Sequence, residues 1–302
     1  DHNGSGNGTL ETAISCEKDK DHFVLILDVM KKILVPVDFS AYSEYALEVA
    51  AILAKQHGAG IVLLHMIGMS DSILANSEIA EEAEAKYFLK LAKEKIKEFT
   101  ERQYLQNVAV STIIQNYKDF GEVNQVAKEQ NCDLVVMGSH GTSGFSDLFV
   151  GSNTEKVVRS SELPVIVIKK PHKDFTINKM VMACDLGKEC IPVYRKAKTY
   201  AELFSASLEV VYINSAGANF MGHDDVEKRM ESFKGEIGKD VKVDFYNHHS
   251  VERGILNYCF EKDADLLVIP THGRKGLAHF VVGSLAENVS NHAKMPVMTI
   301  KL

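Results

Sequence analysis

Apolar runs of strand length alternate with amphipathic helical stretches along the chain from residue 30 to residue 302. The apolar runs are nearly continuous, as in parallel strands that are buried on both faces of a sheet. This alternation predicts right-handed βαβ crossovers and a doubly wound parallel sheet. Strands are expected near residues 32–37, 61–66, 108–114, 134–137 and 165–168, and again near 179–184, 208–213, 241–246, 265–269 and 297–301. Helices are expected near residues 41–57, 77–102, 120–131 and 152–161, and again near 189–205, 223–237, 250–262 and 284–293.

The same order of elements occurs twice because the sequence contains an internal repeat. Residues 133–169 align with residues 265–301 without a gap at an offset of 132, and 15 of the 37 positions are identical. Two stretches between residues 32 and 66 match residues 179–213 at an offset of 147. Copy two therefore lacks 147 − 132 = 15 residues, which we expect to come from a shortened surface helix. The predicted fold is α/β, with two tandem Rossmann-like domains that each contain a five-stranded parallel doubly wound sheet.

The repeat divides the chain into a leader and two domains. We expect residues 1–29 to be a leader or flexible appendage, residues 30–170 to form copy one and residues 179–302 to form copy two. The linker between the copies contains a proline and several charges. The leader begins with a Gly- and Asn-rich stretch, which cannot repay the entropy of ordering. The alternative is that residues 23–27 add an edge strand to the sheet.

Composition and charge exclude several classes of function. The chain has 34 Lys and Arg residues against 41 Asp and Glu residues, a formal net charge of −7, with no basic cluster of the kind that nucleic-acid binding requires. No apolar run reaches the roughly 18 to 20 residues of a membrane-spanning helix. The five cysteines are odd in number and contain no C-x-x-C pair. We therefore predict a cytoplasmic protein with free thiols that binds neither nucleic acid nor membranes.

A glycine pattern follows the fourth strand of copy one. Gly138 and Gly141 stand at the end of that strand, and Gly151 and Ser152 open the next helix. Glycine permits a sharp turn and close approach of the backbone to a ligand, and free N–H groups at a helix start attract anions. The alternative is that the glycines are ordinary turn residues and that Ser152 is an N-cap. Because ligands bind at the carboxyl ends of strands in such sheets, we favour a phosphate-binding loop.

Other catalytic and metal-binding patterns find little support. The chain contains no G-x4-G-K-[ST] loop, no G-x-S-x-G elbow and no H-E-x-x-H pair. The histidines of copy two, including the adjacent His248 and His249, lack any known zinc-ligand spacing. We therefore expect no dedicated metal site built from side chains and assign no catalytic residue.

On these residues the chain resembles the universal stress protein family. The resemblance covers residues 30–302 as two tandem copies and rests on KKILVPVDFS, LLHM, MGSHG and the G-x2-G-x9-G-[ST] signature of copy one. It implies adenine nucleotide alpha-hydrolase-like domains with ATP, or ADP or AMP, across the strand ends, and Mg²⁺ or Mn²⁺ held through the phosphates. The nucleotide-binding positions that it implies are Pro36, Val37, Asp38, Met66, Met137, Gly138, His140, Gly141, Gly151, Ser152, Asn153 and Thr154.

The resemblance also implies a role for each group of positions. Residues 36–38 would line the adenosine, and Met66 and Met137 would pack on the base. Residues 138–141 would approach the ribose and phosphates, and residues 151–154 would hold the phosphates. For Asp38 there is a second interpretation, in which its carboxylate caps the helix that begins near residue 41.

Copy two departs from this pattern. Pro270 stands at the position of Gly138, where it fixes φ, removes a backbone donor and adds a ring. Gly273, Gly283 and Ser284 are retained, whereas Leu285 and Ala286 replace the polar residues of copy one. We expect copy two to bind nucleotide weakly or not at all and to serve as a scaffold.

The function that this resemblance implies is a nucleotide-responsive stress regulator. The loop supplies no convincing general base and no Lys or Arg clamp, so any ATP hydrolysis is expected to be slow. The alternatives are a slow ATPase and a nucleotide-free module for interaction or dimerisation. In the family the last strand mediates dimerisation, so we expect residues 165–168 and 297–300 to pair within the chain about a pseudo-twofold axis. Whether two chains form a homodimer is left open.

Overall fold

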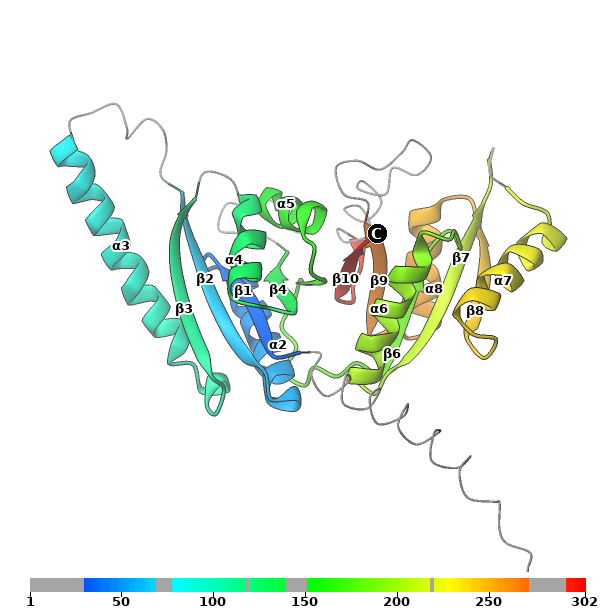
Figure 1. Ribbon diagram of the computed structural model, residues 1–302, viewed down its shortest axis with the longest axis horizontal. Coiled ribbons are helices and arrows are strands. Elements are labelled where there is room, and N and C mark those ends of the chain that lie inside the picture. The colour runs from blue at the N-terminus through cyan, green and yellow to red at the C-terminus, as the bar shows by residue number, and fades with distance from the viewer. Residues whose placement is uncertain (1–29, 69–77, 118–119, 140–150, 218–219, 272–291) are drawn as a thin grey trace, which may run out of the picture.

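The computed structural model describes residues 30–68, 78–117, 120–139, 151–217, 220–271 and 292–302 (Figure 1). The leader, with its alternative edge strand, lies outside the described residues. So does nearly all of the predicted helix near residues 284–293.

The described parts of the two copies follow the same order of strands and α-helices from β1 to β4 and from β6 to β9. Copy one consists of β1 (Lys32–Val37), α2 (Ala41–His57), β2 (Gly60–Gly68), α3 (Glu78–Thr100), η2 (Gln103–Leu105), β3 (Val110–Tyr117), η3 (Phe120–Glu122), α4 (Val123–Glu129), β4 (Leu134–Gly138), α5 (Ser152–Ser160) and β5 (Val165–Ile168). Copy two consists of β6 (Lys179–Ala183), α6 (Cys190–Leu203), β7 (Ser207–Ser215), α7 (His223–Ile237), β8 (Lys242–His248), α8 (Val251–Glu261), β9 (Leu266–Thr271) and β10 (Val297–Lys301). Every predicted strand is present, with ends that differ from the prediction by a few residues.

All ten described strands belong to one sheet with the order β3-β2-β1-β4-β5-β10-β9-β6-β7-β8. Neighbours within each copy pair in parallel, which confirms the predicted doubly wound topology. The two copies meet where β5 and β10 pair antiparallel, with Ile166 opposite Met298. The predicted pairing of the last strands within one chain is therefore confirmed.

Helices cover both faces of this sheet, because alternate strand residues point to opposite sides. Ile33 and Val35 belong to a core beneath α2, α3, α6 and α7 that runs across both copies. Leu34, between them in sequence, belongs to a second core beneath α4 and α5, and α8 covers the corresponding face of copy two. Figure 1 shows the long α3 at one end of the sheet and α7 at the other.

Two identical residues of the repeat have the same structural role in each copy. The Asp133 carboxylate accepts hydrogen bonds from the backbone N–H groups of Lys31 and Lys32, at 2.6 and 3.0 Å. Asp265 accepts from the residues that precede and open β6 in the same way, at 2.8 and 3.0 Å. Each aspartate therefore fixes the start of the first strand of its copy against the start of the fourth.

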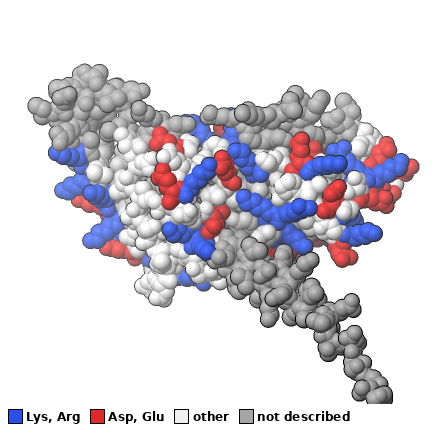
Figure 2. Space-filling model, viewed as in Figure 1, with Lys and Arg blue, Asp and Glu red and all other residues white. Residues whose placement is uncertain are grey.

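The surface carries charges of both signs. Over the face in Figure 2, Lys and Arg side chains alternate with Asp and Glu side chains. Several form ion pairs on the surface, such as Lys128 with Glu162 at 2.7 Å. Among the described helices, none is long and apolar enough to span a membrane.

Candidate functional site

The predicted site of copy one lies at the carboxyl ends of β1, β2 and β4, beside the start of α5. Pro36, Met66 and Met137 lie one or two residues before the ends of these strands and are buried. Met66 and Met137 belong to the same core beneath α4 and α5, and strand alternation turns Pro36 to that face as well. Val37 points to the opposite face, beneath α2. The structure thus brings three of the positions assigned to the adenosine into one apolar row across the sheet.

Asp38 organises the turn between β1 and α2. Its Oδ1 accepts hydrogen bonds from the backbone N–H of Ser40 at 3.1 Å and from the Ser40 hydroxyl at 2.6 Å. Ser40 Oγ in turn accepts from the N–H of Ser43, which makes Ser40 the N-cap of α2. The interpretation of Asp38 as the cap is therefore wrong, because the carboxylate orients the capping serine instead.

Phe39, between these residues, has a left-handed backbone with φ of 65°. Its ring packs on that of His65, with 4.3 Å between the centroids. His65 Nδ1 lies 2.8 Å from the carbonyl oxygen of Val37, and burial lowers the pKa of this histidine. Phe39 and His65 thus hold the ends of β1 and β2 together. The sequence placed His65 in the LLHM strand but did not indicate this role.

Gly138 is a glycine because helix α2 lies against it. A Cβ at this position would come within 2.6 Å of the carbonyl carbon of Tyr42 and 2.7 Å of its oxygen. Real Cβ atoms essentially never make such contacts, so the helix backbone excludes any side chain here. The sequence assigned this glycine to close approach by a nucleotide, whereas the contact that the structure shows is helix packing.

The start of α5 is the part of the site best suited to an anion. Gly151 is its N-cap, with φ of −62° and ψ of 149°, and the alternative that Ser152 is the N-cap is wrong. Ser152 and Asn153 are exposed. N–H groups in the first turn of a helix have no acceptor within the helix, so they can bind a phosphate.

Thr154 has a structural role at the same helix start. Its side chain is buried, and its hydroxyl donates a hydrogen bond of 2.8 Å to the carbonyl oxygen of Gly138. The backbone N–H of Gly151 donates to the carbonyl oxygen of Ser139 at 2.7 Å. These bonds tie α5 to the end of β4, so the Thr154 side chain is not available to a phosphate. His140 and Gly141 lie outside the described residues.

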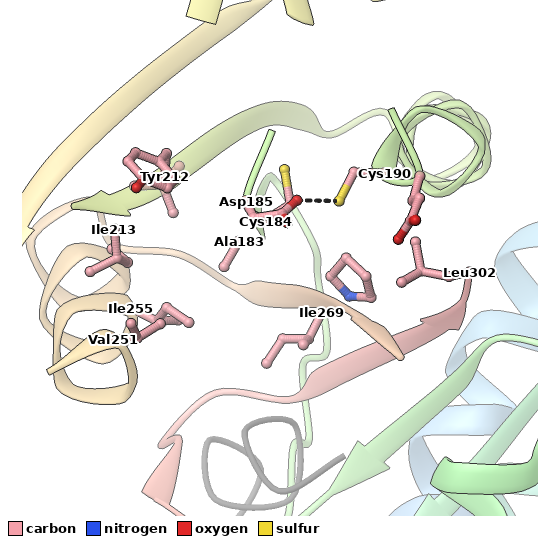
Figure 3. A pocket seen from close by; sticks show the side chains of 13 residues that line it. Ala183, Cys184, Asp185, Cys190, Tyr212, Ile213, Val251, Ile255, Ile269 and Leu302 are labelled. Carbon is pink, nitrogen blue, oxygen red and sulfur yellow. Dashed lines mark hydrogen bonds between the residues drawn. The ribbon is translucent and has the colours of Figure 1, made fainter. Parts of the chain in front are cut away.

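Copy two has a cavity of about 70 Å³ at the equivalent edge of the sheet (Figure 3). Six of its lining residues stand, at the repeat offsets of 147 and 132, where copy one has Pro36, Val37, Asp38, Met66, Met137 and Gly138. These six are Ala183, Cys184, Asp185, Ile213, Ile269 and Pro270. Six of the twelve positions assigned to the nucleotide in copy one therefore have counterparts that line a cavity in copy two.

Copy two, which has Pro270 in place of glycine, also differs from copy one at the start of its first helix, α6. Ala41, where α2 begins, corresponds to Lys188, but α6 begins two residues later at Cys190. Leu186 has a φ of 60°, close to that of its equivalent Phe39, and the N–H of Gly187 donates to Asp185 Oδ1 at 2.9 Å. The turn after the first strand is therefore preserved, whereas the helix starts two residues later in the copy that carries Pro270 in place of glycine.

Among the described residues, metal-binding side chains do not gather in either copy. In the part of the chain that the structure describes, no group of three or more His, Cys, Asp or Glu side chains could hold a metal ion.

Comparison with known proteins identifies relatives of both copies. The model of the universal stress protein family matches residues 30–169 and 176–301. Universal stress protein Slr1230 from Synechocystis is 24% identical over 296 residues, which is 90% of this chain and 100% of that protein. Universal stress protein MJ0577 from Methanocaldococcus jannaschii is 30% identical over 154 residues, 46% of this chain and 95% of that protein.

Solved structures show the same fold. The crystal structure of a universal stress protein from Archaeoglobus fulgidus has a TM-score of 0.62 and 21% identity, and the match covers 89% of this chain and 98% of that one. At this identity the likeness concerns the fold alone, and it extends over both copies.

Proposed function

Because the chain belongs to the universal stress protein family, we propose that copy one binds an adenine nucleotide and that the protein acts as a nucleotide-responsive stress regulator in the cytoplasm. ATP is the ligand proposed first, with ADP and AMP as the alternatives. The observation that carries the proposal is the exposed, glycine-capped start of α5 beside the buried apolar row at the ends of β1, β2 and β4.

The geometry suggests how the parts of a nucleotide would be divided over the site. The base would lie against the apolar row that contains Met66 and Met137, and the ribose would lie near Asp38. The phosphates would accept hydrogen bonds from the first-turn N–H groups of Ser152 and Asn153. None of the twelve assigned positions is Lys or Arg, so Mg²⁺ or Mn²⁺ bound to the phosphates would supply the remaining positive charge.

Slow turnover follows from the same residues. Asp38 and His140 are the only titratable side chains among the twelve positions. Asp38 Oδ1 already accepts two hydrogen bonds from Ser40, so its geometry serves the turn rather than a water molecule. We therefore propose binding without rapid hydrolysis, which suits a protein that reports nucleotide state.

The two copies are proposed to differ in this function. Residues 30–170 would form the nucleotide-binding domain, and residues 179–302 would form a scaffold domain that binds nucleotide weakly or not at all. Pro270 supports this difference, since it lines the copy-two cavity at the position of Gly138. The expected stoichiometry is one nucleotide for each chain.

A matched pair of variants at Gly151 tests nucleotide binding. Asp and Asn are equally good N-caps, so G151D and G151N should both fold, but only G151D places a negative charge beside the phosphates. Two unit charges 4 Å apart interact by about 1 kcal/mol in water and about 4 kcal/mol near a protein surface. We expect G151D to weaken ATP binding about tenfold or more in a calorimetric titration.

The control decides the interpretation of that titration. G151N should bind ATP within a fewfold of the unsubstituted protein, and both variants should keep its thermal unfolding midpoint without nucleotide. Equal affinity of G151D and G151N would refute the phosphate site at α5. Absence of any adenine nucleotide in acid extracts of the purified protein, together with no thermal shift in millimolar ATP, would favour the nucleotide-free module.

A further inference from the structure

The copy-two cavity brings two cysteine side chains to one wall. Cys184 follows β6 and Cys190 opens α6, and both line the cavity. The Cys190 thiol donates a hydrogen bond to Asp185 Oδ1 at 3.2 Å, and Asp185 directly follows Cys184 in the chain. Figure 3 shows both sulfur atoms beside the Asp185 carboxylate. Both cysteines are free thiols in the structure.

Copy one provides an internal comparison, because it has no sulfur at either position. Val37 corresponds to Cys184 and Ser43 corresponds to Cys190 at the offset of 147. The Ser43 hydroxyl donates to the carbonyl oxygen of Ser40 at 2.9 Å. Two positions of one pocket are thus both cysteine in the copy that has Pro270 at the position of Gly138.

The two thiols differ in burial. Cys184 is half-buried and lies at the cavity, whereas Cys190 is buried. The hydrogen bond with Cys184 and then burial raise the pKa of the Cys190 thiol far above its usual value, so Cys190 stays protonated at neutral pH. An oxidant that enters the cavity therefore reaches Cys184 first, and Cys190 is placed to react with the product.

We propose that Cys184 and Cys190 form a reversible disulfide when copy two meets a peroxide, so that the cavity is a redox modification site. The Cys184 thiolate attacks one oxygen of hydrogen peroxide, the O–O bond breaks, and the departing hydroxide takes a proton to give water and a Cys184 sulfenic acid. The Cys190 sulfur then attacks the Cys184 sulfur and the S–O bond breaks.

The second step also balances. The hydroxide that leaves Cys184 takes the Cys190 proton, which Asp185 Oδ1 is positioned to relay, and a second water forms. Two thiols and one peroxide thus give one disulfide and two waters. A thiol reductant reverses the reaction by disulfide exchange. The crosslink would join the end of β6 to the start of α6 and remove the S–H donor from Asp185.

The sequence allows a direct assay, because Lys188 separates the two cysteines. Trypsin cleaves after Lys179, Lys188 and Arg195, so the cysteines fall into the peptides 180–188 and 189–195. The full-length protein is treated with hydrogen peroxide, alkylated and digested without reductant. We expect these two peptides to appear joined in the mass spectrum and to separate after dithiothreitol.

Variants taken from copy one test the order of the steps. Cys184→Val and Cys190→Ser introduce the residues that copy one already accommodates. Cys184→Val should leave Cys190 reduced at the same peroxide dose, whereas Cys190→Ser should accumulate sulfenic acid at Cys184, detected with dimedone. Cys132→Ser and Cys259→Ser should still form the crosslink, since both thiols are buried in separate apolar clusters.

Three results would overturn the proposal. One is the absence of joined peptides at peroxide doses that oxidise Cys184. Another is a crosslink from Cys184 to any other cysteine. The third is oxidation of Cys190 in the Cys184→Val variant at the rate seen in the unsubstituted protein. Circular dichroism of each variant verifies folding, and the peroxide assay on the unsubstituted chain stands without them. The inference is independent of nucleotide binding in copy one.

Discussion

The glycine at position 138 separates two explanations that the sequence alone could not distinguish, and Gly138→Ala tests them. If the glycine serves nucleotide approach, alanine should impair binding and leave the free protein unchanged. If it serves packing, alanine should destabilise the protein with or without nucleotide. The structure favours the second explanation, because the added Cβ would meet three Tyr42 atoms, the carbonyl carbon, the oxygen and Cβ, at 2.6, 2.7 and 2.9 Å.

The expected cost follows from which atoms are in contact. Two of the three are backbone atoms of α2, so the helix itself must move away from β4. Inserting a methyl group into a well-packed core costs about 1 to 3 kcal/mol, and displacement of backbone belongs at the upper end of that range. We expect Gly138→Ala to lower the free energy of unfolding in urea by about 3 kcal/mol.

Gly60→Ala is the matched control, since its Cβ would lie no closer than 3.4 Å to any atom. This control should change the unfolding free energy by less than about 0.5 kcal/mol. Both measurements are made without nucleotide and repeated with ATP. A Gly138→Ala protein that unfolds at the same urea concentration as the unsubstituted protein but no longer binds ATP would refute the packing argument.

Two further substitutions probe other parts of the fold. The buried Tyr200 of α6 donates a hydrogen bond of 2.9 Å to the carbonyl oxygen of Asp133 in copy one, so Tyr200→Phe should lower the free energy of unfolding in urea by about 1 kcal/mol. The control is Tyr246→Phe, which loses an exposed hydrogen bond to Glu261 and should lower the free energy of unfolding little. Burial lowers the pKa of Lys169 from 10.5 to about 8, so the folded state binds this proton more weakly than the unfolded state and stability should rise with pH between these two values. Lys169→Met should reduce this increase of stability with pH and raise the unfolding midpoint at pH 7. Lys170→Met, at the neighbouring exposed position, should do neither. An unchanged pH dependence of stability in Lys169→Met would contradict the lowered pKa of Lys169.

Local periodicity was sufficient to predict the strands, the described helices and their order, because buried parallel strands and amphipathic helices each have a characteristic hydrophobic spacing over a short stretch of sequence. The repeat then indicated that the two copies would share one topology. The pairing of β5 with β10 could be predicted only from the family resemblance, since the sequences of two short apolar edge strands do not determine which strand each one pairs with.

The parts that sequence reasoning missed depend on contacts across long separations. Tyr42 meets Gly138 across 96 residues, and nothing near either residue signals that contact. Capping of α2 by Asp38 was one of two interpretations of that residue, since aspartate is a good N-cap, and only the geometry shows that its carboxylate accepts hydrogen bonds from Ser40, which is the N-cap. The cysteine pair of copy two was counted among scattered thiols, since a spacing of six residues has no meaning until a strand end and a helix start face each other.

The divergence of copy two extends beyond its loop. A residue with a Cβ cannot occupy the position of Gly138 while the helix starts where α2 starts, and copy two has both Pro270 and a helix that starts two residues later. The same region carries the cavity and both cysteines, whose equivalents in copy one are a core valine and a serine of the first turn of α2. Restoring glycine at position 270 would therefore leave the helix start and the thiols of copy two in place. The two copies therefore differ over the whole pocket and not only in the glycine loop, so the loop signature alone does not describe what distinguishes them.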